Sequence, residues 1–352
     1  MFTSPPLRGR GTSENPPNRF IPLYRERIDE WIDPEDPAPV SRFFRDDTRT
    51  ILATNDSPDI PFSFSLNPYR GCEHGCIYCY ARPTHEWLSL SAGLDFETQI
   101  FVKEKAPELL RKELSAKKWV PQNVSISGVT DAYQPVERRL QLTRRCLEVF
   151  AEFRNPVGIV TKNALVARDI DILQELARFN AAMVYLSVTT LDPELARVME
   201  PRASTPAARL RAIEELTQAG IPVGVLIAPV IPGLTDHETP AILEATAKAG
   251  AITAGYVVLR LPFAVKDLFE TWLEQHYPAR KEKVLGRLRE ARGGQLNDSR
   301  FGSRMRGEGD WAELFRDMFR LQRKRAGMTE RGPELSAASF TTGRPVQGSL
   351  FE

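Results

Sequence analysis

Three cysteines that lie close together in the sequence have the clearest capacity for chemistry. Cys72, Cys76 and Cys79 have the spacing C-x3-C-x2-C, and the aromatic residue Tyr78 precedes the last of them. Three thiolates can bind three irons of a cubane 4Fe–4S cluster, which leaves the fourth iron with an open coordination position. A reactive metal site needs such a position, whereas a structural site is closed by protein ligands. The spacing therefore predicts a reactive iron–sulfur cluster.

The same three cysteines have other uses in proteins. A structural zinc site takes four ligands, and His74 or His85 is near enough in the sequence to supply the fourth. A protein with such a site would be a non-enzymatic zinc-binding adaptor. A tight cysteine loop can also be redox-active or simply buried. Cys146, the remaining cysteine, lies on the apolar face of a predicted helix and is expected to be a core thiol.

Composition sets limits on the class of protein. The chain has 352 residues, of which 42% are apolar, and this is enough for one large core. No apolar run approaches the length of a membrane helix, and the first residues carry no signal-peptide pattern. Four cysteines, three of them in one loop, are not a disulfide framework. We therefore expect a cytoplasmic protein that does not contact a membrane.

Short β-rich runs alternate with helical patterns along the middle of the chain. The runs cover 62–66, 123–127, 157–161, 183–188, 223–227 and 256–259, and the helical patterns cover 105–117, 139–153, 168–178, 206–219 and 237–249. This alternation predicts parallel βα units, here six rather than the eight of a closed barrel. The expected fold class is α/β, a partial (β/α)6 TIM-like barrel with an extended N-terminal arm and a helical C-terminal extension. An additional strand is expected within residues 96–102.

Composition also changes along the chain and predicts four segments. Residues 1–60 form a proline-rich arm, 61–275 the barrel, 276–328 a basic helical extension and 329–352 a flexible tail. Residues 281–330 contain 13 Lys and Arg against 8 Asp and Glu. Such an excess fits a nucleic-acid-binding surface, and it equally fits the solvated face of a long helix.

The cysteine spacing resembles that of the radical S-adenosylmethionine (SAM) superfamily. The resemblance extends to a subgroup related to spore photoproduct lyase, often labelled DNA repair photolyase-like, through Asn55–Phe62, Tyr80–Glu86, Gly93–Glu97, Glu200–Arg202 and Arg300–Gly307. It implies a partial barrel that holds a 4Fe–4S cluster on the three cysteines and binds SAM. It also implies reductive cleavage of SAM to a 5′-deoxyadenosyl radical, with flavodoxin or ferredoxin as an electron donor.

The resemblance further implies roles for residues at the carboxyl ends of the strands, where the functional groups of a parallel barrel gather. Gly128, Thr130 and Asp131 follow the second strand, where relatives bind the SAM amino group. The usual Gly-Gly-Glu pattern of relatives is absent at this place. An alternative reading is that these residues form a turn leading into the next helix.

Further SAM-binding residues are implied at the later strand ends. Lys162 follows the third strand, where its ammonium can pair with the SAM carboxylate or remain an exposed loop lysine. Ser187 and Thr189 follow the fourth strand, where relatives bind the ribose. Tyr78 lies where relatives place a residue against the adenine.

These motifs leave the substrate open. We expect a nucleic acid, with radical modification of a protein or peptide as the alternative. In spore photoproduct lyase a cysteine thiol returns the hydrogen atom, but here the spare thiol, Cys146, is predicted to be buried. Tyr133 and His85 are therefore the candidate catalytic residues near the mouth of the barrel.

The sequence ends in a segment with a resemblance of its own. Gln347-Gly-Ser-Leu-Phe351 resembles the short peptide by which bacterial replication and repair proteins bind the sliding clamp. Two apolar anchors in a terminal tail suit capture in a groove of a partner. The alternative is that Leu350 and Phe351 pack onto their own domain.

Overall fold

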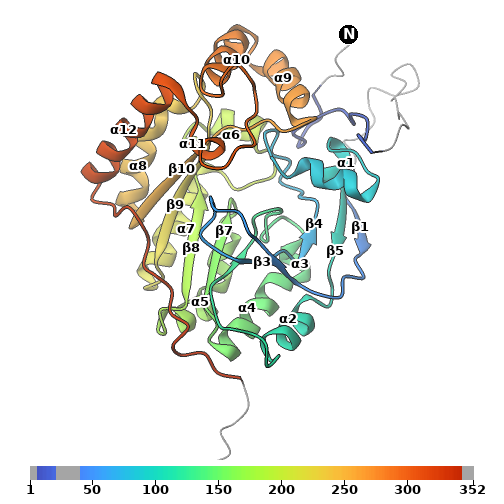
Figure 1. Ribbon diagram of the computed structural model, residues 1–352, viewed down its shortest axis with the longest axis vertical. Helices are drawn as coiled ribbons and strands as arrows, with labels where there is room; N and C mark the ends of the chain where they lie inside the picture. Colours follow the sequence, from blue (N-terminus) through green and yellow to red (C-terminus); the bar gives the residue numbers. More distant parts are fainter. Residues whose placement is uncertain (1–5, 21–39, 343–352) are drawn as a thin grey trace, which may run out of the picture.

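The computed structural model describes residues 6–20 and 40–342 and contains a seven-stranded main sheet (Figure 1). The strand order is β10-β9-β8-β7-β6-β3-β2. Six of the strands are parallel, and β2 pairs antiparallel with β3 at one edge. The strands are β2 (Leu52–Thr54), β3 (Phe64–Leu66), β6 (Val124–Ile126), β7 (Val157–Thr161), β8 (Ala182–Ser187), β9 (Val223–Val230) and β10 (Thr253–Val258). The predicted partial (β/α)6 barrel is confirmed.

Helices connect these strands and pack their apolar faces on the sheet. They are α2 (Ala106–Leu114), α3 (Glu137–Leu140), α4 (Leu142–Phe153), η3 (Ala164–Asp169), α5 (Ile170–Ala177), α6 (Pro193–Met199), α7 (Pro206–Gln218), η4 (Asp236–Glu238) and α8 (Thr239–Lys248). Helices α6 and α7 begin where sequence chemistry favours it, because Asp192 and Thr205 cap free N–H groups and a proline follows each. The helix predicted at 139–153 is interrupted at Gln141, whose φ is +52°.

The core lies between the main sheet and these helices. Strand β8 is buried along nearly its whole length, and helices α5 and α7 pack against it in the core. Cys146 on α4 is completely buried in this core, which confirms the prediction for that thiol.

A second, three-stranded sheet lies beside the barrel on the right of Figure 1. It consists of β1 (Arg42–Arg45), β5 (Gln99–Val102) and β4 (Tyr69–Arg70), with β5 in the middle. The strand predicted at 96–102 is shorter than expected, because α1 (Leu94–Thr98) occupies its first half. The carboxylate of Asp95 accepts the N–H of Ser91 and the amide of Gln99, which holds this helical turn.

An N-terminal strap, residues 10–19, lies along the segment that contains η2 (Arg82–Leu88) and α1. Asn15 exchanges side-chain and backbone hydrogen bonds with Asp95, and Asn18 donates to the carbonyls of Glu86 and Leu90. At position 93 a Cβ would lie 2.0 Å from the Glu14 carbonyl, so only glycine fits beneath the strap. Part of the predicted arm is thus ordered against the barrel.

The C-terminal extension is helical and lies at the top and left of Figure 1. It consists of α9 (Val265–His276), η5 (Pro278–Arg280), α10 (Lys281–Glu290), α11 (Ser303–Arg306) and α12 (Gly309–Arg325). Beyond α12, Thr329 forms a β-bridge with Thr253 on the edge strand β10. Near the last described residues, the N–H of Thr341 donates to the carbonyl of Phe153. The clamp-like segment Gln347–Phe351 lies outside the described residues, and the division into four segments stays a prediction.

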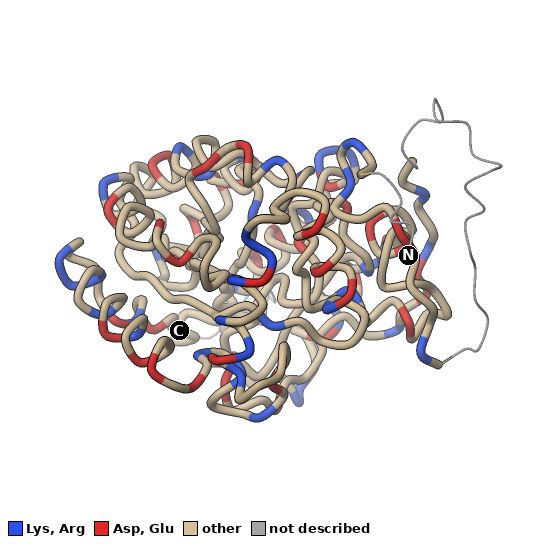
Figure 2. Tube along the Cα trace, turned by 90° about the horizontal axis from the view of Figure 1, so that it is seen from above, with Lys and Arg blue, Asp and Glu red and all other residues tan. Residues whose placement is uncertain are grey.

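Charged residues are distributed over the whole molecule. Figure 2 shows basic and acidic positions interspersed along the trace rather than collected on opposite faces. In the described part of the chain, no helix is long and apolar enough to span a membrane.

Candidate functional site

The cysteine loop follows β3 and β4 and is buried along most of its length. Cys72 and Cys76 are less than one tenth exposed, and Cys79 is partly exposed. Burial raises the pKa of the Cys72 thiol, and the nearby Asp131, Cys76 and Cys79 raise this pKa further. The three thiols therefore lie close enough to interact electrostatically. A metal would be needed to hold them as thiolates in this environment.

This donor set fits a cubane with one open iron. The fourth cysteine, Cys146, is in the core on α4 and is not part of the loop. Within residues 6–20 and 40–342, no three Cys, His, Asp or Glu side chains are arranged to hold a single metal ion. In a cubane each cysteine binds a different iron, so its three thiols need not converge on one point.

A buried arginine at the start of η2, just after the cysteine loop, fixes the backbone of that loop. Arg82 is fully buried and donates hydrogen bonds to the carbonyls of Gly75 and Cys76 at 3.2 and 3.0 Å. It also donates to the carbonyls of Ala92 and Gly93, and its guanidinium pairs with the buried carboxylate of Glu97. The side chain thus ties the cysteine loop to the segment that the N-terminal strap covers.

The strap completes the same network from the other side. The Gly11 N–H donates to Glu97 at 3.0 Å, so this carboxylate accepts from both Arg82 and the strap. A Cβ at position 11 would lie 1.7 Å from the Gly75 carbonyl. The close approach of the two backbones therefore requires glycine at position 11.

Asp131 connects the second strand end to the third. Its carboxylate accepts the N–H of Lys162 at 2.8 Å and the hydroxyl of Thr161 at 2.7 Å. Burial alone would raise the pKa of Asp131, but His74 and the N–H donors of Lys162 and Tyr133 outweigh it and lower this pKa to about 2. The carboxylate is therefore ionised at neutral pH and already has several partners within the protein.

His74, which lies inside the cysteine loop, is held from both sides of its ring. Its Nδ1 lies 3.4 Å from Asp131 and its Nε2 lies 3.1 Å from the amide nitrogen of Asn163. Asn163 in turn accepts from the hydroxyl of Ser204. The loop is thereby joined to the ends of β6 and β7.

Lys162 extends toward the mouth of the barrel. Its ammonium lies 3.3 Å from the carbonyl of Ala228 and 5.7 Å from the centre of the Tyr78 ring. No carboxylate among the described residues forms an ion pair with it, so its charge is available to an anionic group of a ligand. Lys162 and Tyr78, predicted on separate segments, are thus brought together.

Tyr78 belongs to a buried network on the other side of the loop. Its hydroxyl donates to Glu200, which also pairs with Arg209 and accepts from Thr189 at 2.8 Å. Arg209 donates in addition to the Ser187 carbonyl at 2.9 Å. Ser187 and Thr189 therefore lie near Tyr78, and the hydroxyl of Thr189 is already engaged by the protein.

The stretch after β6 has an unusual backbone. Ser127 and Gly128 have φ values of +89° and +106°, and a Cβ at Gly128 would meet no atom within 4 Å. The N–H groups of Val129 and Thr130 both point to the side-chain oxygen of Asn67, at 3.4 and 3.3 Å. The open space at Gly128 leaves room for a ligand to approach the backbone.

The two candidate catalytic residues lie in closed surroundings. Tyr133 is fully buried, and its hydroxyl donates to Asp169 at 3.1 Å. His85 is also fully buried, with Nε2 at 2.9 Å from the Gln99 carbonyl and its ring against Phe96 and Phe101. These contacts favour structural roles for both residues, and their catalytic assignment stays untested.

The burial of His85 predicts a pH-dependent stability. Burial lowers the pKa of His85 from 6.5 to about 4, so the unfolded chain binds more protons than the folded one between these values. The free energy of unfolding should therefore fall by up to about 3 kcal/mol as the pH drops through this window. Chemical denaturation at a series of pH values should show this loss in the wild type and not in His85→Gln. The exposed His237→Gln should behave as the wild type, and equal slopes in all three proteins would contradict the prediction.

Several residues of this site carried no readable signal in the sequence. Arg82, Glu97, Glu200 and Arg209 form two buried ion pairs beneath the cysteine loop. Arg82, Glu97 and Glu200 lie in segments that carry the family resemblance, but that resemblance gives them no role. Charged residues are almost never fully buried unless paired, and pairing between distant segments appears only in three dimensions.

Comparison with known proteins places this geometry in a family. An uncharacterised protein of Mycobacterium tuberculosis is 37% identical over 233 residues, which cover 66% of this chain and 67% of that protein. An uncharacterised protein of Methanocaldococcus jannaschii is 30% identical over 221 residues, covering 63% and 79%. Spore photoproduct lyase in complex with dinucleoside spore photoproduct has a similar fold, with a TM-score of 0.57 and 16% identity over 81% of this chain and 80% of that one.

The family model of the radical SAM superfamily matches residues 66–246, which include the cysteine loop and the barrel strands β6, β7, β8 and β9. Members of this superfamily bind a 4Fe–4S cluster and SAM and need a reductant. The match covers more than half of the chain, and the protein therefore belongs to the radical SAM superfamily.

Proposed function

We propose that this radical SAM enzyme acts on a nucleic acid and that Cys72, Cys76 and Cys79 hold its cluster. When bound, the cluster and SAM supply a 5′-deoxyadenosyl radical that takes a hydrogen atom from the substrate. The family assignment favours the enzyme over the zinc-binding adaptor. Flavodoxin or ferredoxin stays the proposed electron donor, and the clamp-binding role of Gln347–Phe351 stays a prediction.

The residues around the loop support a binding place for SAM. The ammonium of Lys162 is available for a carboxylate, and the open backbone at Gly128 offers space beside Thr130 and Asp131. Glu200 holds Tyr78 by its hydroxyl, so the ring keeps one orientation next to Lys162. Ser187 and Thr189 complete the proposed set. Asp131 then acts mainly by positioning Lys162.

The observation that carries the choice of substrate is a row of exposed aromatic side chains beside the cysteine loop with arginines packed against them, here called the rim. Tyr80 directly follows Cys79, is 49% exposed, and donates to the Gly128 carbonyl. The Arg260 guanidinium lies 5.0 Å from the centre of the Tyr80 ring. Arg304 stacks on Phe301, which is 60% exposed.

The rim continues along the loop after β10 to the N-terminal strap. Phe263 is 62% exposed, and the Arg19 guanidinium lies 3.7 Å from the centre of its ring. Phe20 and Trp87 follow at 4.4 Å between ring centres, with Trp87 73% exposed. The rim is thus built from four separate parts of the chain.

This combination matches what single-stranded nucleic acid requires. Exposed rings offer stacking platforms of about 1–3 kcal/mol per base, and arginines pair with phosphates. Arg19 and Arg304 already pair with Glu86 and Asp59, whereas Arg260 forms no ion pair with a carboxylate of the described residues and is available to a phosphate. The fold is shared with spore photoproduct lyase, whose structure with a dinucleoside photoproduct is known. A radical enzyme acting on a peptide stays the alternative, because aromatic and arginine residues are also common in protein interfaces.

Two measurements test the proposal in order. The protein is reconstituted anaerobically, analysed for iron and sulfide, and incubated with dithionite and SAM. About four irons per chain and release of 5′-deoxyadenosine would support the cluster and SAM assignment. Release that increases with added oligonucleotide, but not with unrelated peptides, would support the nucleic acid. Zinc in place of iron would reject the assignment of the cysteines.

Removing one ring of the rim should weaken nucleic-acid binding. Tyr80→Ala is expected to raise the Kd for a single-stranded oligonucleotide about tenfold, because one stacking platform is lost. Fluorescence anisotropy with a labelled oligonucleotide measures this, and the affinity should fall steeply with salt. Phe43→Ala is the matched control, since Phe43 is also stacked by an arginine, Arg139, but lies on the small sheet. Equal loss in both variants would point to a general surface effect.

A further inference from the structure

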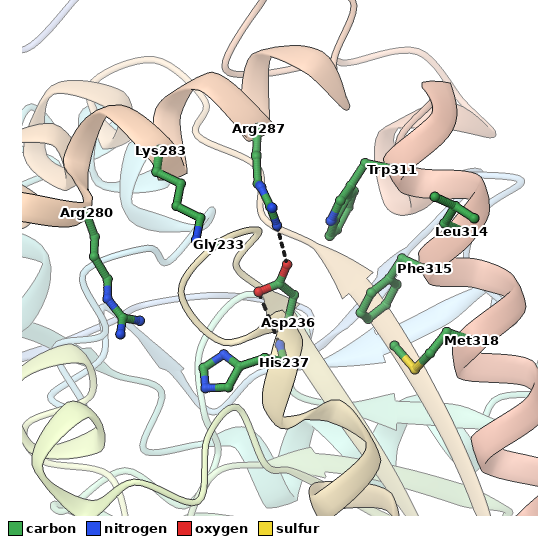
Figure 3. A pocket seen from close by; sticks show the side chains of 10 residues that line it. All are labelled: Gly233, Asp236, His237, Arg280, Lys283, Arg287, Trp311, Leu314, Phe315 and Met318. Atoms are coloured by element: carbon green, nitrogen blue, oxygen red, sulfur yellow. Dashed lines mark hydrogen bonds and ion pairs between the residues drawn. The ribbon is translucent and has the colours of Figure 1, made fainter.

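A groove of about 510 Å³ lies between α10 and α12, with the loop after β9 as its floor (Figure 3). The two walls differ in chemistry. Arg280, Lys283 and Arg287 face it from one side, and the other side is formed by Trp311, Leu314, Phe315 and Met318. None of the residues that line this groove belongs to the cysteine loop or to the proposed SAM-binding set.

The basic wall has unused charge. Arg287 pairs with Asp236 on the floor at 3.3 Å. Arg280 and Lys283 are exposed, and neither forms an ion pair with any carboxylate of the described residues. The three residues are spaced i, i+3 and i+7, so they follow one side of the helix. Two cations therefore face the groove ready for carboxylates of a ligand.

The apolar wall borders the side of α12 that packs on the core, because Trp311 and Met318 contact the core cluster. Phe315 and Phe319 are buried against Tyr256 and fix the helix on the barrel. Leu314 is nevertheless 72% exposed and Leu321 is 48% exposed. With Trp311 and Met318 they form a stripe at positions 311, 314, 318 and 321, here called the seam. Alternating steps of three and four residues are the spacing by which one helix packs along another.

We propose that this groove binds an amphipathic helical segment of a partner protein that carries carboxylates along one side. Apolar side chains of that segment pack on the seam, and its carboxylates pair with Arg280 and Lys283. This inference does not depend on which substrate the enzyme modifies.

Two other occupants fit the groove less well. A nucleic acid would use the cations, but the most exposed side chain of the apolar wall, Leu314, is aliphatic. Of the two aromatic residues in this wall, Phe315 is buried and Trp311 stacks on it rather than standing free for a base. A second copy of this chain would bring a helix with five basic and three acidic residues against the basic wall. Like charges would then face each other, which disfavours the pairing.

A selection from a random peptide display library tests the proposal with the full-length, anaerobically reconstituted protein. Peptides that bind the wild type are counter-selected against Lys283→Glu/Leu314→Asp, which changes both walls. Enriched peptides should have apolar residues at helical spacing and Asp or Glu on the adjacent side. A labelled enriched peptide should bind the double variant at least tenfold more weakly by fluorescence anisotropy.

Charge exchange gives the sharper readout. A peptide in which the acidic residues are replaced by lysine should bind Lys283→Glu more tightly than it binds the wild type. If the substitution only disturbed the structure, it would weaken the binding of both peptides and would not make the variant favour the lysine peptide. Arg289→Glu/Val120→Asp carries the same kinds of change at exposed positions outside the groove and should bind like the wild type. Thermal unfolding followed by circular dichroism checks that each variant is folded.

Several results would overturn the inference. The first is that no peptide is enriched, and the second is that the enriched peptides lack acidic residues. The third is that an enriched peptide binds Lys283→Glu/Leu314→Asp as tightly as the wild type. A wild-type dimer that Leu314→Asp converts to a monomer would identify a second copy as the occupant. An oligonucleotide of thymidines that binds the wild type but not Lys283→Glu would identify a nucleic acid instead.

Discussion

Cys76→Ala is expected to abolish SAM cleavage by the reconstituted protein. Loss of an outer-shell partner of a metal site typically costs about 10–100-fold, so loss of a proposed ligand should cost at least ~100-fold. With two cysteines, two of the four irons would have no protein ligand, and the cluster would not be held stably. The measurement is the rate of 5′-deoxyadenosine release under anaerobic conditions with dithionite, together with iron content.

Cys146→Ala provides the matched control for this experiment. It removes the one cysteine outside the loop, a core thiol on α4 that is completely buried. It should keep full iron content and activity while losing some thermal stability. If Cys76→Ala retained four irons and normal SAM cleavage, the assignment of the loop as cluster site would be wrong.

Arg82→Met is expected to lower the free energy of unfolding by about 3–5 kcal/mol, because removing one partner leaves the buried Glu97 carboxylate without its cation. The substitution also removes hydrogen bonds to the carbonyls of Gly75, Cys76, Ala92 and Gly93. The cysteine loop depends directly on these bonds. Chemical denaturation of the metal-free protein measures the change, and iron content after reconstitution should fall as well.

Two further variants make this prediction decisive. Arg82→Met/Glu97→Met removes both charges and should be more stable than Arg82→Met alone, since no unpaired charge remains in the interior. Arg197→Met breaks the exposed pair with Glu194 and should change stability by no more than about 1 kcal/mol. If Arg82→Met lowered the free energy of unfolding no more than Arg197→Met does, the cysteine loop would not depend on Arg82.

The barrel was predictable from the sequence because each of its strands is marked by a run of apolar residues that are neighbours in the sequence. The runs at 157–161 and 223–227 coincide with β7 and with the first part of β9, since apolar and β-branched residues fill these runs apart from one glycine in each. The chemistry of the loop was readable for the same reason, because three cysteines within eight positions carry a local spacing. The family comparison agrees with both conclusions.

The remaining structure depends on contacts between distant segments. The second sheet joins β1 to β5 across 57 positions from Arg42 to Gln99, and the sequence predicts a strand near β5 but not its partner β1. His85 and Tyr133 looked catalytic because polar residues next to a strand end are often functional. Their actual neighbours, Gln99 with Phe96 for the first and Asp169 for the second, could not be inferred from sequence position.

The N-terminal strap has a consequence for the order in which the molecule is assembled. The strap is synthesised before residues 86–97, which contain hydrogen-bond partners of Gly11, Asn15 and Asn18. The strap can therefore take its place only after the cysteine loop and α1 have formed. Until then the strap does not cover the cysteine loop, so the segment that is made before the loop is put in place after it. A fusion partner placed N-terminal to the strap would therefore slow the docking of the strap rather than the folding of the barrel.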